Sequence, residues 1–158
     1  MDILDEFTEL VSRLESEGVE YATCGGLALA VHGFVRATKD IDLLILADDL
    51  QKCFVIAQTA GYDIEGLPLD FDGGAFQIRR LSKIDRETKS LITIDFILVT
   101  DAIRDVWEDR EHVTWGSGEA WVVSRKGLIK MKTNAGRDQD LVDIRRLEEA
   151  EDESNDKG

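Results

Sequence analysis

Three aspartates in this sequence stand where their side chains could do chemistry together. Asp40 and Asp42 open a predicted strand that continues as the apolar run from Leu43 to Leu46. Because alternate residues of a strand point to the same face, these two carboxylates should project side by side. The unbroken apolar run after them is typical of a strand that is covered on both faces. Two carboxylates at the mouth of such a strand repel each other and lose hydration unless a cation lies between them.

The third carboxylate, Asp95, lies alone inside the apolar run from Leu91 to Val99. An acid in such a strand must find a partner, because an unpaired buried charge is costly. Hard oxygen ligands favour divalent cations such as Mg²⁺ or Mn²⁺. We therefore expect a metal site if the strand of Asp95 lies beside the strand that Asp40 and Asp42 open.

The alternative for Asp40 and Asp42 is a solvated strand entrance that is paired with Lys39 and Arg36. Taken without Asp95, the pair supports both interpretations equally. Arg36 itself would either reach a phosphate or neutralise the aspartates.

A Gly25-Gly26 turn precedes the aspartates and leads into a short apolar helix that ends at His32. Glycine lets backbone N–H groups approach a ligand closely, and a helix N-terminus favours anions. By itself, the Gly-Gly pair would more often be only a turn. His32 lies on an apolar helix, and we expect a structural role for it rather than a catalytic one.

Length and composition predict one globular domain over residues 1–150, followed by a disordered acidic tail over residues 151–158. The net charge of −14 argues against a general nucleic-acid binder, but leaves room for RNA at a local basic patch. Cys24 and Cys53 show neither metal spacing nor a disulfide framework, which fits a reducing cytoplasm. The acidic N-terminus is not a signal peptide, and no run approaches the roughly 20 apolar residues of a membrane span.

Hydrophobic periodicity predicts an α/β (α+β) fold with a mixed β-sheet flanked by helices and with C-terminal helices. The predicted helices are Ile3 to Glu17, Leu27 to His32, Asp49 to Ala60, Asp101 to Arg110, a helix capped by Ser124 that runs through Met131, and Asp138 to Glu149. The predicted strands are Val19 to Cys24, Ile41 to Leu46, Tyr62 to Ile64, Ala75 to Leu81, Leu91 to Val99, His112 to Trp115 and Ala120 to Val123. The segment from Glu65 to Gly74, which holds Pro68, is predicted to be a loop.

The order of these features resembles the DNA polymerase beta-like nucleotidyltransferase superfamily. The resemblance rests on a Gly-Gly turn, a helix, Asp-x-Asp opening a strand and a lone Asp in a later strand. The fuller string is similar to a small bacterial branch that includes abortive-infection nucleotidyltransferase toxins. It consists of Gly25-Gly26-Leu27-Ala28-Leu29, His32-Gly33, Arg36-Ala37-Thr38 and Asp40-Ile41-Asp42.

The resemblance implies a nucleotidyltransferase that uses Mg²⁺ or Mn²⁺ and a nucleoside triphosphate. Asp40, Asp42 and Asp95 would hold metal ions, and Asp95 would lie nearest the acceptor hydroxyl. Gly25 and Gly26 would contact the triphosphate. Many superfamily members carry Ser after the first glycine, so Gly26 removes a hydroxyl contact.

Further nucleotide-binding residues are implied by the same resemblance. They are Arg36 and Thr38 near the aspartates, and Lys132, Arg137 and Asp140 in the C-terminal helices. Asp140 and Asp143 lie three apart on one helix, so a solvated face or a helix cap explains them equally well.

The acceptor is an RNA end such as tRNA, a protein or a small molecule. RNA would need two basic groups to flank the aspartates. These groups are Arg79, Arg80, Lys83, Arg86 and Lys89 on the hairpin, and Arg125, Lys126, Lys130 and Lys132 on the first C-terminal helix.

Two classes of function remain open at the level of sequence. One is an enzyme that moves a nucleoside monophosphate from an NTP to a hydroxyl, in a toxin–antitoxin or phage-defence setting that the resemblance implies. The other is a catalytically silent member that keeps the fold as a binding or antitoxin-like partner. The acidic triad favours the enzyme, because a protein that only binds has no need of three converging carboxylates.

Overall fold

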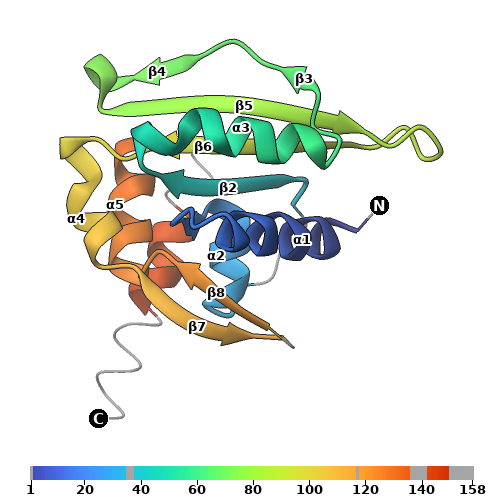
Figure 1. Cartoon of the computed structure of the whole chain (residues 1–158). Helices are drawn as coiled ribbons and strands as arrows, with labels where there is room; N and C mark the ends of the chain where they lie inside the picture. Colours follow the sequence, from blue (N-terminus) through green and yellow to red (C-terminus); the bar gives the residue numbers. More distant parts are fainter. Residues whose placement is uncertain (1, 35–37, 117, 136–141, 150–158) are drawn as a thin grey trace.

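A computed structural model of the chain describes residues 2–34, 38–116, 118–135 and 142–149 (Figure 1). The α-helices are α1 (Ile3–Ser16), α2 (Gly25–Val31), α3 (Leu50–Thr59), α4 (Arg104–Glu108) and α5 (Arg125–Ala135). The strands are β1 (Ala22–Cys24), β2 (Asp40–Ile45), β3 (Ile64–Glu65), β4 (Leu69–Phe71), β5 (Phe76–Ile84), β6 (Leu91–Leu98), β7 (Glu111–Trp115) and β8 (Gly118–Val122). Short 3₁₀ turns cover Ala47–Asp49, Asp72–Gly74 and Asp101–Ile103, and residues 142–149 are helical.

One mixed sheet runs through the described part of the chain in the order β3-β5-β6-β2-β1-β8-β7, with β4 pairing to β5 at the edge. Its centre is the parallel pair of β2 and β6. The hairpin of β5 and β6 is antiparallel, as is the pair of β1 and β2. The mixed α/β sheet that the sequence predicts is thus confirmed.

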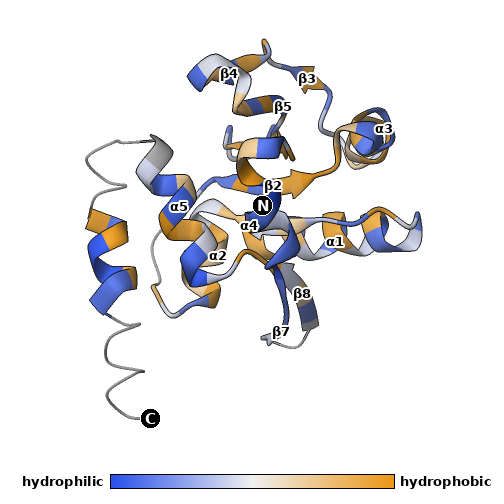
Figure 2. Cartoon of the chain, turned by 90° about the vertical axis from the view of Figure 1, so that its left-hand side faces the viewer, coloured by the Kyte–Doolittle hydropathy of each residue, from blue (hydrophilic) through white to orange (hydrophobic). Residues whose placement is uncertain are grey.

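Helices cover both faces of the sheet (Figure 2). Helices α1 and α3 cover one face, where Leu14 of α1 packs into a core with Leu43 and Phe96 of the central strands. On the other face, α2, α4 and α5 pack over Leu44 and Ile97. Because side chains alternate along a strand, each of β2 and β6 buries residues on both faces, which explains their unbroken apolar runs.

Local side chains set the ends of two helices that matter for the sheet and the site. The Oδ1 atom of Asp2 accepts a hydrogen bond from the Leu4 backbone N–H at 2.8 Å, which starts α1. The Oγ atom of Ser124 accepts from the Gly127 N–H at 3.1 Å, so the predicted cap of α5 is confirmed. These caps anchor α1 on one face and α5 on the other.

The segment from Glu65 to Gly74 departs from its prediction as a loop. Its residues Leu69–Phe71 form β4 and pair antiparallel with Phe76–Ile78 of β5. Pro68 and the glycines after Phe71 favour a loop prediction for this segment. The structure instead pairs it with the edge that β5 offers.

No helix in the described ranges is both long and apolar enough to cross a membrane. The predicted acidic tail, residues 151–158, lies outside the described residues.

The core predicts a clear contrast between two leucines of α1. Leu14 is fully buried and Leu4 is 47% exposed. Leu14→Ala should lower the free energy of unfolding by about 2–5 kcal/mol, because it leaves a cavity. Leu4→Ala should change it by less than about 1 kcal/mol. Urea denaturation of both variants tests this, and equal losses would contradict the packing of α1.

Candidate active site

The parallel pairing of β2 with β6 brings the three predicted aspartates together. Asp42 lies directly opposite Asp95, and Asp40 lies opposite Thr93. All three carboxylates share the sheet face of Leu44 and Ile97, because strand side chains alternate. This is the face that α2 and α5 cover, so the aspartates lie where these helices meet the sheet.

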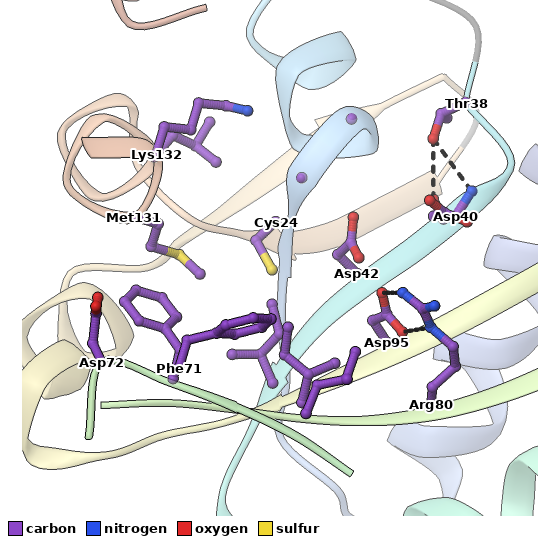
Figure 3. A pocket seen from close by; sticks show the side chains of 17 residues that line it. Cys24, Thr38, Asp40, Asp42, Phe71, Asp72, Arg80, Asp95, Met131 and Lys132 are labelled. Carbon is purple, nitrogen blue, oxygen red and sulfur yellow. Dashed lines mark hydrogen bonds and ion pairs between the residues drawn. The ribbon is translucent and has the colours of Figure 1, made fainter. Parts of the chain in front are cut away.

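A pocket of about 550 Å³ opens over these carboxylates (Figure 3). One end is polar and the other is apolar. The polar lining is Gly25, Gly26, Thr38, Asp40, Asp42, Arg80, Asp95 and Lys132. The remaining lining is Cys24, Leu69, Phe71, Asp72, Phe76, Ile78, Ile97, Leu128 and Met131. The pocket therefore has a charged end at β2 and β6 and a largely apolar wall from β4, β5, β6 and α5.

The junction of β1 and α2 lies close to the Asp42 carboxylate. Gly25 has φ of +65°, a left-handed conformation that favours glycine, and a side chain there would collide with the Asp42 carboxylate. A Cβ on Gly26 would lie 3.1 Å from both the Cβ and the Oγ1 of Thr38. Thr38 thus occupies the space beside Gly26, and its Oγ1 places a hydroxyl group there.

Burial and like charge both act on the Asp42 carboxyl group. They raise its pKa to about 7, with burial the largest cause, followed by the charges of Asp95 and Asp40. Burial also raises the pKa of Asp40, and the charge of Asp95 adds to the effect. The guanidinium of Arg80 acts in the opposite direction on both groups. The cluster is short of positive charge, which a bound cation would supply.

Arg80 of β5 holds Asp95 in a two-pronged ion pair (Figure 3). Its Nε donates to Oδ1 at 2.7 Å and its Nη2 donates to Oδ2 at 3.0 Å. The hydrogen bond to Asp95 raises the pKa of Arg80, and the charges of Asp40 and Asp42 add to this. Both oxygens of Asp95 therefore already accept from a cation.

The site fits a divalent cation in part. Asp40 and Asp42 offer hard oxygen donors, and burial together with neighbouring carboxylates raises the pKa of both. Asp95 differs from them, because both of its oxygens accept a hydrogen bond from Arg80. No group of three acidic, histidine or cysteine side chains in the described ranges is arranged to hold a metal ion.

Lys132 reaches the pocket from α5, as the sequence predicts, but it is buried in an ion pair. Its Nζ donates to the Oδ2 of Asp143 at 3.0 Å, and the two side chains are 8% and 3% exposed. The charge of Lys132 also lowers the pKa of Asp42. The solvated face considered for Asp143 is therefore wrong. Three of the predicted nucleotide-binding residues lie outside the described residues, namely Arg36, Arg137 and Asp140.

Sequence reasoning missed the place of Arg80 and Asp143 in this site. The sequence groups Arg80 with the basic residues of the hairpin that could meet RNA, whereas the structure pairs it with Asp95 on the neighbouring strand. The available signal was the lone Asp95, whose need for a partner points to a cation across the hairpin. For Asp143 no comparable signal exists, because its pairing with Lys132 depends on how two helices pack.

At least five of the nine residues in the two predicted basic groups are in ion pairs. Besides Arg80 and Lys132, Arg79 donates to Asp70 at 2.9 Å, Lys83 to Glu6 at 2.8 Å and Lys130 to Asp105 at 2.7 Å. Paired cations contribute little to a track for a polyanion.

His32 donates or accepts a hydrogen bond with the Val123 carbonyl at 2.9 Å, so it ties the end of α2 to the end of β8. It does not line the pocket over the aspartates. This contact fits the expected structural role, which stays a prediction.

Solved structures share this architecture, although no protein-family model and no curated protein sequence matches the chain. TM1012 of Thermotoga maritima, a candidate nucleotidyltransferase, has a TM-score of 0.63 at 15% identity, covering 94% of this chain and 93% of its own. LnuA, a lincosamide antibiotic adenylyltransferase with lincomycin bound, has a TM-score of 0.60 at 16% identity, covering 91% of this chain and 95% of its own. ANT(2″)-Ia, in complex with adenylyl-2″-tobramycin, has a TM-score of 0.60 at 12% identity, covering 90% and 85%. The chain therefore has the nucleotidyltransferase fold.

Gly25 and Gly18 provide a matched test of the turn beside Asp42. Both have positive φ, +65° and +74°, but only Gly25 has a neighbour where a Cβ would lie. Each change to Ala should cost roughly 1–2 kcal/mol of backbone strain. Gly25→Ala should cost more, because it must also displace the Asp42 carboxylate. Urea denaturation measures both, and equal costs would show that the turn does not press on Asp42.

The pKa of Asp42 predicts how the stability of the metal-free protein depends on pH. The folded state holds this proton more tightly than the unfolded state, whose pKa is about 3.9. The stabilising contribution is therefore complete below about pH 4 and is lost as pH rises through about 7. Asp42→Asn removes this loss, so its stability relative to the wild type should increase by about 2–3 kcal/mol from pH 5 to pH 8.

Urea denaturation in EDTA at both pH values checks this expectation. Asp63→Asn is the control, because Asp63 is exposed in the loop before β3. If Asp42→Asn instead destabilised the protein at pH 8, Asp42 would have a structural role.

Proposed function

We propose that this chain is a metal-dependent nucleotidyltransferase that moves a nucleoside monophosphate from an NTP to a hydroxyl group of a small molecule. The observation that carries the proposal is the convergence of Asp40, Asp42 and Asp95 on one face of β2 and β6, beside the Gly25-Gly26 turn. The nucleotidyltransferase fold supports it.

The charged end of the pocket is the proposed place of reaction. A divalent ion held by Asp40 and Asp42 would neutralise charge on the triphosphate. Gly25 and Gly26 line the pocket with backbone atoms, where phosphate oxygens would bind. Thr38 adds a hydroxyl group next to Gly26. This hydroxyl could replace that of the serine which many superfamily members carry at the position of Gly26.

Lys132 and the aspartates would divide the remaining work. Lys132 supplies positive charge from the α5 side, and Asp143 holds its ammonium group in position. Asp95 lies farthest from the Gly25-Gly26 turn across the sheet, since β2 lies between β6 and β1. It is the carboxylate we place nearest the acceptor hydroxyl.

The acceptor is inferred from the shape and charge of the pocket. A structured RNA end would need free cations around the aspartates, but Arg79, Arg80 and Lys132 are in ion pairs. The wall formed by Phe71, Met131 and their neighbours suits the apolar part of a small molecule. Two proteins with this fold were solved with small hydroxylated compounds, lincomycin and adenylylated tobramycin, which supports the same class.

Label transfer from an NTP tests the proposal. The full chain is incubated with Mg²⁺ or Mn²⁺, each α-labelled NTP, and separately with total RNA, lysate protein and a panel of hydroxylated small molecules that includes lincosamides and aminoglycosides. Label should move to a small molecule from one preferred NTP, and EDTA should abolish the transfer.

Asp42→Asn should reduce this transfer to background, whereas Asp63→Asn should leave it unchanged. Transfer to RNA would refute the acceptor class while keeping the enzyme. An absence of transfer to every acceptor, with NTP binding retained, would instead favour a silent binding protein with this fold.

A further inference from the structure

We propose that Arg80 takes the place of a second metal ion, so that this site holds one divalent cation rather than two. The inference rests on the proposed function, because it concerns the cation that Asp40 and Asp42 would bind. Three carboxylates in a nucleotidyltransferase site are expected to hold two ions about 4 Å apart. Here the third carboxylate, that of Asp95, is paired with the guanidinium of Arg80.

The ion pair of Arg80 and Asp95 engages both oxygens of the carboxylate and places a positive charge beside them. The two hydrogen bonds, at 2.7 and 3.0 Å, engage one oxygen each. Planar two-pronged pairs of this kind are among the stronger polar contacts in proteins. The Asp95 side chain is 9% exposed and the Arg80 side chain is 42% exposed, so the carboxylate is buried and the guanidinium reaches it from the surface.

The strand register holds Arg80 in this place. Arg80 and Asp95 are directly opposed in the antiparallel pair of β5 and β6, as Asp42 and Asp95 are in the parallel pair of β2 and β6. Asp42, Asp95 and Arg80 thus form a row across three neighbouring strands. On its outer side, Arg80 packs against Gly66, where a Cβ would lie 3.3 Å from the Arg80 Cβ, and the Gly66 N–H donates to the Arg80 carbonyl at 3.0 Å.

The charges of the row also suit one divalent ion. Arg80 neutralises Asp95, which leaves Asp40 and Asp42 as the carboxylates without a full partner. One divalent cation balances these two. A second ion at Asp95 would have to lie beside the guanidinium, which cannot lose its proton in a protein, or displace it.

Metal binding to the full chain, measured by Mn²⁺ electron paramagnetic resonance without nucleotide, tests this inference. An ion is assigned to the site when the wild type binds it and Asp42→Asn does not. Ions that bind elsewhere on the acidic surface bind to both proteins and are subtracted by this comparison. The wild type should bind one such ion and show no spin coupling between ions. Arg80→Gln should bind two and show the coupling of a pair about 4 Å apart.

Arg79→Gln is the matched control. Arg79 is the next residue of β5, loses the same charge, and pairs with Asp70 instead of Asp95. It should bind one ion, like the wild type, and thermal melting confirms that each variant is folded.

The outcomes separate this inference from the proposed function. Two coupled ions in the wild type would overturn the role of Arg80 and leave metal-dependent transfer intact. One ion in both the wild type and Arg80→Gln would also overturn it, since Arg80 would then not exclude the second ion. No site ion in any variant would overturn both this inference and the metal dependence of the proposed function.

Discussion

The parallel pairing of β2 with β6 is the constraint on which the rest of the site depends. It sets Asp42 directly opposite Asp95 on a face that helices cover. Burial and the like charges of Asp95 and Asp40 raise the pKa of Asp42, so the cluster costs free energy in the folded state. The charges of Lys132 and Arg80 offset part of that cost, because they lower the same pKa.

Elements far apart in the chain supply the compensation. Strand β5 brings the guanidinium of Arg80, and α5 brings the ammonium of Lys132, which Asp143 of the helix at 142–149 holds. The Gly25 turn leaves the backbone close to the Asp42 carboxylate. The hydrophobic cores on the two faces of the sheet stabilise the fold and offset the destabilisation by this cluster. Functional sites commonly lower stability in this way.

The apolar end of the pocket depends on a different part of the fold. Strand β4 adds to the edge of the sheet through β5 and contributes Leu69 and Phe71 to the wall. Met131 of α5 faces the same space from the other side (Figure 3). A charged end and an apolar wall within one pocket can bind a molecule that carries both a reactive hydroxyl group and an apolar part.

The sequence by itself determined the features that short-range patterns encode. Periodicity and local hydrogen bonding predict the helix that begins at Ile3 and the cap at Ser124. Strand alternation in the same way puts Asp40 and Asp42 on one face. Tertiary structure decided which partners those groups meet. The register that opposes Arg80 to Asp95 depends on the pairing of strands across a long hairpin, and the contact of Lys132 with Asp143 depends on the packing of two helices. Strand β4 likewise depends on tertiary structure, because three residues with a short alternation do not form a strand without an edge to join, and β5 supplies that edge.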